Sequence, residues 1–235
     1  MPMSLPVEII PAIMPRSFLD LKEKVSIVKG ATKVVQVDLC DGVFVKRVTW
    51  PFHAEDKESM DQIISETTGM PEWESVDYEL DLMVADAVKN IGNYFFLGPK
   101  RIIFHIEAFT DPKELSDYFE NLELYIKENT EFGIALNIDT DISVLEPFVS
   151  HIKFIQCMGI ATIGRQGEPF DERVIEKIKS IRAKYPDMVI SIDGGVSFDT
   201  APELIEAGAT RLVAGSAIFE NPNPHGAIQE LKSLR

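Results

Sequence analysis

Short apolar runs rich in β-branched residues alternate with longer amphipathic segments along the whole sequence, and this alternation constrains the fold more than any other feature. Strands that alternate with helices predict a parallel sheet with right-handed crossovers. Eight such units within 235 residues favour a closed barrel over an open doubly wound sheet. We therefore predict an α/β fold, a single (β/α)8 TIM barrel formed by residues 1–235. Its strands are expected at Glu8–Met14, Lys33–Leu39, Val76–Met83, Lys100–Ile106, Phe132–Ile138, His151–Cys157, Met188–Asp193 and Arg211–Ala214.

The amphipathic segments between these strands predict the outer helices. They are expected at Ser17–Val28, Glu58–Thr67, Ala85–Ile91, Asp111–Glu128, Ser143–Phe148, Asp171–Lys184, Thr200–Glu206 and His225–Leu234. The stretch at about 51–77 is charged and longer than one connecting helix needs. We predict an expanded loop and helix there, which forms a lid, a subunit contact or only a surface excursion.

Composition narrows the possible partners. The formal net charge of −15 argues against nucleic acid, because phosphate backbones are bound by clustered Lys and Arg. No apolar stretch reaches about 18 residues, so no membrane partner is expected. The segment Met1–Pro6 lacks the features of a signal peptide, and Cys40 and Cys157 are too few for a disulfide framework. We expect a cytoplasmic protein that forms a homo-oligomer.

Two segments, Ser191–Val196 and Val213–Ile218, each combine a short apolar strand with glycine-rich backbone that leads toward a helix. Glycine lets backbone N–H groups approach a ligand closely, and a helix start adds partial positive charge. In parallel α/β barrels the loops after strands seven and eight commonly form a phosphate site. The sequence therefore predicts an enzyme that acts on a small phosphorylated molecule.

Carboxylates stand at the ends of three predicted strands, where the working residues of such barrels lie. They are Asp38, Asp81 and Asp193. Because Asp38 and Asp193 belong to strands two and seven, a substrate over the barrel mouth would meet a carboxylate on each face. That geometry suits removal of a proton from one face of a carbon next to a carbonyl, and its return to the other face, through an enediolate.

Several segments together resemble the ribulose-phosphate 3-epimerase family. They are Val35–Val45, Glu79–Val84, Phe104–Glu107, Ser191–Val196 and Ala201–Phe219. The resemblance covers nearly the whole chain and implies a TIM barrel of the ribulose-phosphate binding type. It implies that Asp38 and Asp193 are the catalytic acid–base pair. It further implies a phosphate site made by Gly164, Gln166, Gly194, Gly195, Gly215 and Ser216.

The resemblance also implies a metal site, and this chain departs from it. Members of the family hold zinc or another divalent ion with the two aspartates and two histidines, but Gln36 and Asp81 stand at the histidine positions. The oxygen donors that remain, Asp38, Asp81 and Asp193, favour Mg²⁺ or Mn²⁺ over zinc. If the site holds no metal, mutual repulsion predicts a raised pKa for one of these carboxyl groups.

The other residues expected at the pocket are Gln36, Cys40, Met83, His105 and Met158. His105 is also consistent with a core histidine whose hydrogen bonds are satisfied. Arg165 lies in the predicted loop after strand six. It is either a clamp for a phosphate or carboxylate, or a solvated loop cation.

The pattern as a whole favours an isomerase or epimerase that acts on a ketose phosphate. One alternative is a lyase or decarboxylase on a related sugar phosphate, which usually has a lysine at a strand end. Lys33, Lys100 and Lys153 lie near strand starts instead. The other alternative is a degenerate paralogue that binds a phosphosugar without turning it over, and the two missing histidines support it.

Overall fold

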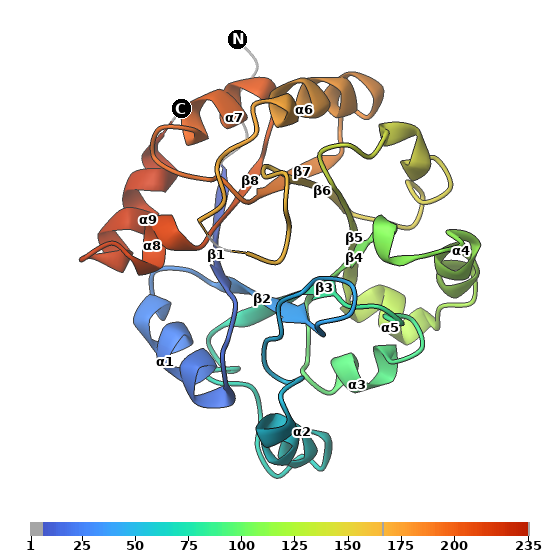
Figure 1. The fold of residues 1–235 in the computed structure, drawn as a ribbon, viewed down its shortest axis with the longest axis vertical. Helices are drawn as coiled ribbons and strands as arrows, with labels where there is room; N and C mark the ends of the chain where they lie inside the picture. The colour runs from blue at the N-terminus through green and yellow to red at the C-terminus, as the bar shows by residue number, and fades with distance from the viewer. Residues whose placement is uncertain (1–6, 166, 235) are drawn as a thin grey trace.

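Residues 7–165 and 167–234 are described by the structure, which is a computed structural model. Eight parallel strands form a closed barrel, in which β1 pairs with both β2 and β8 (Figure 1). The predicted fold class is therefore confirmed. The strands are β1 (Glu8–Ile13), β2 (Val34–Cys40), β3 (Asp77–Met83), β4 (Arg101–His105), β5 (Glu131–Leu136), β6 (Phe154–Met158), β7 (Val189–Asp193) and β8 (Arg211–Ala214).

Side chains along each strand alternate between the barrel interior and the layer that faces the helices. On β2, Val35, Val37 and Leu39 join the large apolar core outside the barrel, whereas Gln36 and Asp38 occupy the intervening inward positions. The register of β2 and β3 sets Gln36 beside Glu79 and Asp38 beside Asp81. The strands thus carry polar side chains into the barrel at matched heights.

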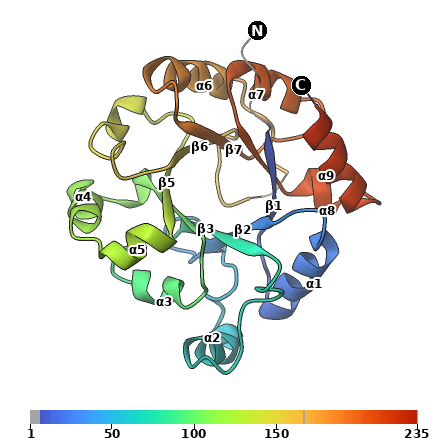
Figure 2. The same ribbon diagram turned by 180° about the vertical axis from the view of Figure 1, so that it is seen from behind.

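Helices surround the barrel on all sides (Figures 1 and 2). On α6, the apolar residues at helical spacing are buried, as the sequence pattern predicts. The helices are α1 (Phe18–Val28), α2 (Lys57–Ile64), α3 (Ile91–Phe95), α4 (Lys113–Glu120), α5 (Leu124–Asn129), α6 (Arg173–Lys184), α7 (Ala201–Ala207), α8 (Ser216–Phe219) and α9 (Pro224–Ser233).

The helix predicted at Asp111–Glu128 is two helices, α4 and α5. The Asn121 side chain donates to the Asp117 carbonyl at 2.7 Å and ends α4, and Glu123 takes an extended conformation before α5 begins. Leu122, between them, is buried. The break allows the Leu122 side chain to be buried, whereas a continuous helix would point it in another direction. Periodicity in the sequence does not reveal this.

Three further differences concern short elements. The helix predicted at Ala85–Ile91 is a turn followed by α3, and the one predicted at Ser143–Phe148 is a 3-10 turn at Ile142–Leu145. The Asp141 side chain accepts from Ser143 N at 2.8 Å and begins that turn. The sequence prediction missed α8, because four residues are too few for a periodic pattern.

The segment 51–77 joins β2 to β3 by way of a 3-10 turn at Ala54–Asp56 and α2. Trp50, just before this segment, is fully buried; its ring centre lies 5.4 Å from that of Phe18 on α1, and its Nε1 donates to Ser59 Oγ on α2 at 2.8 Å. Trp73 is 65% exposed on the same segment. The role of this segment as a lid or subunit contact stays a prediction.

The end of the barrel where the strands begin is closed by a plug of Glu79, Phe154 and Arg211. The Arg211 guanidinium forms an ion pair with Glu79 and lies 4.3 Å from the centre of the Phe154 ring. A side chain at Gly133 would collide with that ring, so β5 makes room for Phe154 by having none. The plug lies at the opposite end of the barrel from the Asp38 and Asp193 carboxylates.

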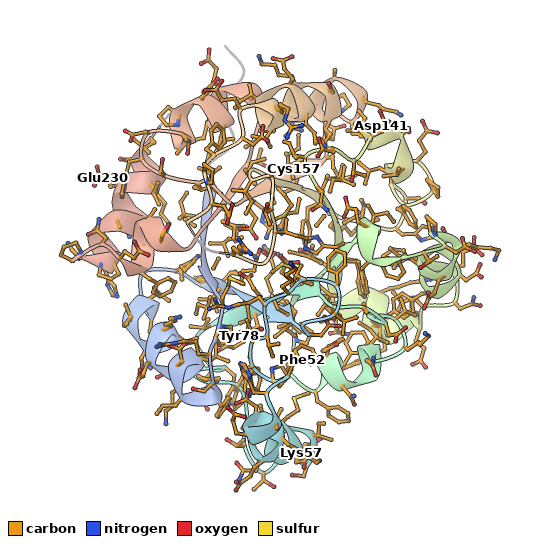
Figure 3. The ribbon with its side chains drawn as sticks, in the orientation of Figure 1. Phe52, Lys57, Tyr78, Asp141, Cys157 and Glu230 are labelled. Atoms are coloured by element: carbon orange, nitrogen blue, oxygen red, sulfur yellow. The ribbon has the colours of Figure 1, made fainter. Side chains whose placement is uncertain are left out.

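Both cysteines are buried and free. Figure 3 shows Cys157 within the ring of helices, in contrast to Lys57 on α2 at the outside. Burial raises the pKa of the Cys157 thiol to about 12, so it is no ready nucleophile. Within the described ranges, no helix has the length and apolarity needed to cross a membrane.

Candidate active site

Three aspartates converge at the carboxyl-terminal ends of their strands. Asp38 and Asp81 are register partners on β2 and β3, and Asp193 is the last residue of β7. One carboxylate oxygen from each lies within 4.8 Å of the other two. The structure thus brings together the three acidic residues that the sequence placed at strand ends.

Two glutamine amides connect these carboxylates. Gln36 Nε2 donates to Asp38 Oδ1 at 2.8 Å and to Asp193 Oδ2 at 2.7 Å. Gln156 Nε2, on β6, donates to Asp81 Oδ2 at 3.2 Å and to Asp193 Oδ2 at 3.4 Å. Each carboxylate is therefore held by at least one neutral donor within a hydrogen-bonded chain across the barrel.

Gln156 is a member of this site that the sequence did not single out. It is fully buried, and its inward position two residues before Met158 follows from the alternation along β6. A polar residue in the middle of a buried strand is the signal that could have found it, because such a group needs partners inside the barrel. The partners here are Asp81, Asp193 and Ser191, whose Oγ lies 3.4 Å from Gln156 Oε1.

His105 completes the chain on the side of β4. Its Nε2 lies 2.8 Å from Asp81 Oδ1, and the Phe44 ring lies 5.6 Å away, centre to centre. Burial lowers the pKa of His105, but the charge and hydrogen bond of Asp81 outweigh it, so the net shift is upward. His105 supports Asp81 rather than facing open space.

Burial and mutual repulsion raise the pKa of two carboxyl groups. For Asp38, burial is the largest cause of a pKa well above its usual range, followed by the charges of Asp193 and Asp81. For Asp193, desolvation and then the charge of Asp81 raise the pKa to about 7. Two neighbouring carboxyl groups with pKa values raised in this way are suited to accept and to donate protons.

A cavity of about 310 Å³ opens above these groups. Asp38, Asp193, Met83 and Met158 line it, together with Gly164, Gly194, Gly195, Gly215 and Ser216. Four of the residues expected at the pocket are fully buried and do not line this cavity: Gln36, Cys40, Asp81 and His105. They can affect a bound molecule only through the residues that do line it. Gln166, also expected at the phosphate site, lies outside the described residues.

Glycine-rich turns form one end of the cavity. Gly194 and Gly195 both have positive φ, at +89° and +69°, directly after β7. A side chain at Gly195 would meet Phe170 at 2.8 Å, so the loop after β6 packs tightly on this turn. Gly215 precedes α8, the short helix after β8, which in many such barrels contributes backbone N–H groups to phosphate.

The donor set suits a hard divalent cation. The convergent carboxylates offer oxygen ligands, and the buried Gln36 Oε1 has no hydrogen-bond partner among the described residues. Oxygen ligands favour Mg²⁺ or Mn²⁺, whereas zinc prefers imidazole and thiolate. The residues that would hold a cation here are Asp38, Asp81 and Asp193.

Fold and site together define a barrel of the ribulose-phosphate binding type. The family model described as "Ribulose-phosphate 3 epimerase family" matches residues 8–219, so the chain belongs to that family. It is 27% identical to ribulose-phosphate 3-epimerase from Bacillus subtilis, over 97% of this chain and 100% of the relative. It is 25% identical to the enzyme of that name from Schizosaccharomyces pombe, over 96% and 92% of the two chains.

Solved structures with the same fold carry other names. KGPDC from Streptococcus mutans has a TM-score of 0.67 at 16% identity, over 97% of this chain and 96% of the other. 3-Keto-L-gulonate-6-phosphate decarboxylase from Vibrio cholerae has a TM-score of 0.62 at 15% identity, over 97% of both chains. At this identity the likeness shows the fold alone.

Proposed function

We propose that this protein is an epimerase that acts on a ketose phosphate, in the manner of its ribulose-phosphate 3-epimerase relatives. The observation that carries the proposal is the pair Asp38 and Asp193, two carboxyl groups with raised pKa values that line one cavity. The glycine-rich turns line the same cavity and suit the phosphate.

The proposed reaction needs one ionised and one protonated aspartate. With the phosphate at the glycine-rich turns, the ionised carboxylate takes the proton from the carbon beside the carbonyl, and the C–H electron pair forms an enediolate. The protonated carboxyl group then returns a proton to the opposite face of that carbon. The Gln36 amide, hydrogen-bonded to both aspartates, keeps the acid and the base at a fixed separation.

A divalent cation is consistent with this scheme. Bound by Asp38, Asp81 and Asp193, it would neutralise charge that develops on the enediolate oxygens. The proposed ion is Mg²⁺ or Mn²⁺, since the described donors are oxygens.

Zinc content tests the choice of metal. We expect elemental analysis of protein purified without added metal to find far less than one zinc per chain. The Gln36→His, Asp81→His double variant should gain zinc, because two imidazoles supply the nitrogen ligands that zinc prefers. About one zinc per wild-type chain would contradict the assignment.

Solvent-deuterium incorporation tests the reaction itself. A panel of ketose phosphates is incubated with the protein in D₂O, and the carbon positions are followed by NMR. An epimerase exchanges the proton beside the carbonyl and produces the second epimer. Cleavage or loss of CO₂ would favour a lyase or decarboxylase. Binding with no exchange at any carbon would favour a degenerate binder.

One observation weighs against the lyase. Arg165 is the sole cationic side chain among the described residues that line the cavity, and no lysine is among them. A lysine at a strand end is the residue that such chemistry usually uses.

A further inference from the structure

The loop after β6 extends over one end of the barrel (Figure 1), and its residues Ile160, Gly164 and Phe170 are among those that line the cavity. At its base, Ile160 pairs with Phe170 in an antiparallel bridge, and these two residues pack on Gly194 and Gly195. Farther along, Gly164 has a φ of +77°, and a side chain there would meet Val45, in the loop after β2, at 2.8 Å. The loop is thus held at its base and along its length, and it lines the cavity.

The next residue, Arg165, brings a positive charge to a cavity that is otherwise acidic. The charged side chains in the described lining are those of Asp38, Asp193, Glu168 and Arg165. Arg165 Nη1 lies 3.8 Å from Glu168 Oε1, beyond hydrogen-bond distance. Its side chain is 60% exposed, so this loose ion pair holds it weakly.

A phosphate dianion in this cavity faces three acidic side chains in a chain with a net charge of −15. Backbone N–H groups supply only partial charges, so a full positive charge nearby favours the bound anion strongly. A guanidinium also matches phosphate oxygens with two parallel hydrogen bonds, which an ammonium group cannot make.

We propose that Arg165 is an anion clamp, which exchanges Glu168 for the substrate phosphate when the substrate binds. The inference rests on the proposed function, because it assigns the phosphate to the glycine-rich turns. It adds a cationic side chain to the glycine-rich phosphate site, and it favours substrates with a doubly charged phosphate at that end.

Calorimetric titration with inorganic phosphate tests the clamp without any turnover. Arg165→Met should weaken phosphate binding about tenfold, as expected for loss of a hydrogen bond between charged groups. The phosphate affinity of Arg165→Lys should lie between those of Arg165→Met and the wild type. Lysine keeps the positive charge but cannot make two parallel hydrogen bonds to one phosphate. Glu168→Gln should tighten binding about threefold, because the competing carboxylate is gone.

Arg173→Met is the matched control. Arg173 is similarly exposed and forms ion pairs with Asp139 and Asp171, but it stands outside the cavity lining. Its loss should leave phosphate affinity unchanged. Acetate, a singly charged carboxylate, should compete poorly with phosphate. Raising the salt concentration should weaken phosphate binding more in the wild type than in Arg165→Met.

The outcomes separate the clamp from the proposed reaction. Equal phosphate affinity in the wild type and Arg165→Met would overturn the clamp, as would weaker binding in Glu168→Gln or tighter binding of acetate than of phosphate. If Arg165 governs phosphate affinity while no ketose phosphate exchanges deuterium, the clamp stands and the epimerase proposal fails. If a ketose phosphate exchanges deuterium while phosphate affinity is independent of Arg165, the epimerase proposal stands and the clamp fails.

Discussion

Asp38→Asn and Asp193→Asn are each expected to lose about 10²–10⁴-fold in epimerase turnover, the usual contribution of a general acid or base. An amide cannot accept the substrate proton or return one, so either substitution removes the chemistry on one face. Steady-state rates on the ketose phosphate that exchanges deuterium give the measurement. Phosphate affinity should change far less, because the glycine-rich turns are untouched.

Asp139→Asn is a suitable control, since that side chain is 78% exposed and stands outside the cavity lining. It should retain wild-type turnover. The two active-site variants also make a directional prediction: one can still exchange the substrate proton from its intact face while failing to epimerise. Wild-type turnover in both variants would refute the two-base mechanism and favour a phosphosugar binder or unrelated chemistry.

Stability should fall as the pH rises from 5 to 8 when a chelator is present. The pKa of Asp193 is about 7 in the folded protein and that of Asp38 is also raised, so the folded state holds protons that the unfolded state has lost. Each pKa unit is worth about 1.4 kcal/mol. The whole shift of the Asp193 pKa represents on the order of 4 kcal/mol, of which roughly 3 kcal/mol is lost between pH 5 and pH 8. His105, whose pKa is also raised, changes stability in the same direction.

Urea denaturation at pH 5, 6, 7 and 8 measures this dependence. Asp193→Asn should flatten it and should be more stable than the wild type at pH 8, since the amide has no charge to bury. Mg²⁺ or Mn²⁺ should restore stability at pH 8 if the carboxylates bind it. A stability that rises steadily from pH 5 to 8 would show that the carboxylates are not destabilised by ionisation.

The barrel and its strand ends could be predicted from the sequence because both depend on local patterns. A parallel barrel places the last residues of its strands at one rim, so Asp38, Asp81 and Asp193 could be expected to meet once the strands were recognised. The short helices are the part of the fold that the sequence predicts least well. The break at residues 121–123, for example, depends on how the buried Leu122 packs.

The connections inside the site could not be predicted in the same way. The sequence places Gln36 at a metal-ligand position of the family. It does not show that the Gln36 amide contacts both Asp38 and Asp193, because those contacts depend on how β2 and β7 are tilted across the barrel. The place of Gln156 between Asp81 and Asp193 depends equally on three-dimensional register. Neither distance follows from a local pattern.

The plug of Glu79, Phe154 and Arg211 closes one end of the barrel, so the aspartates are reached from the other end. The cavity above the aspartates and the cavity at the other end, which Phe154 and Arg211 line, share no lining residue. In the proposed reaction, solvent protons and substrate would therefore reach Asp38 and Asp193 from the same end of the barrel. A substrate bound at that end displaces water from the two carboxylates, so their proton exchange with the solvent slows while the site is filled.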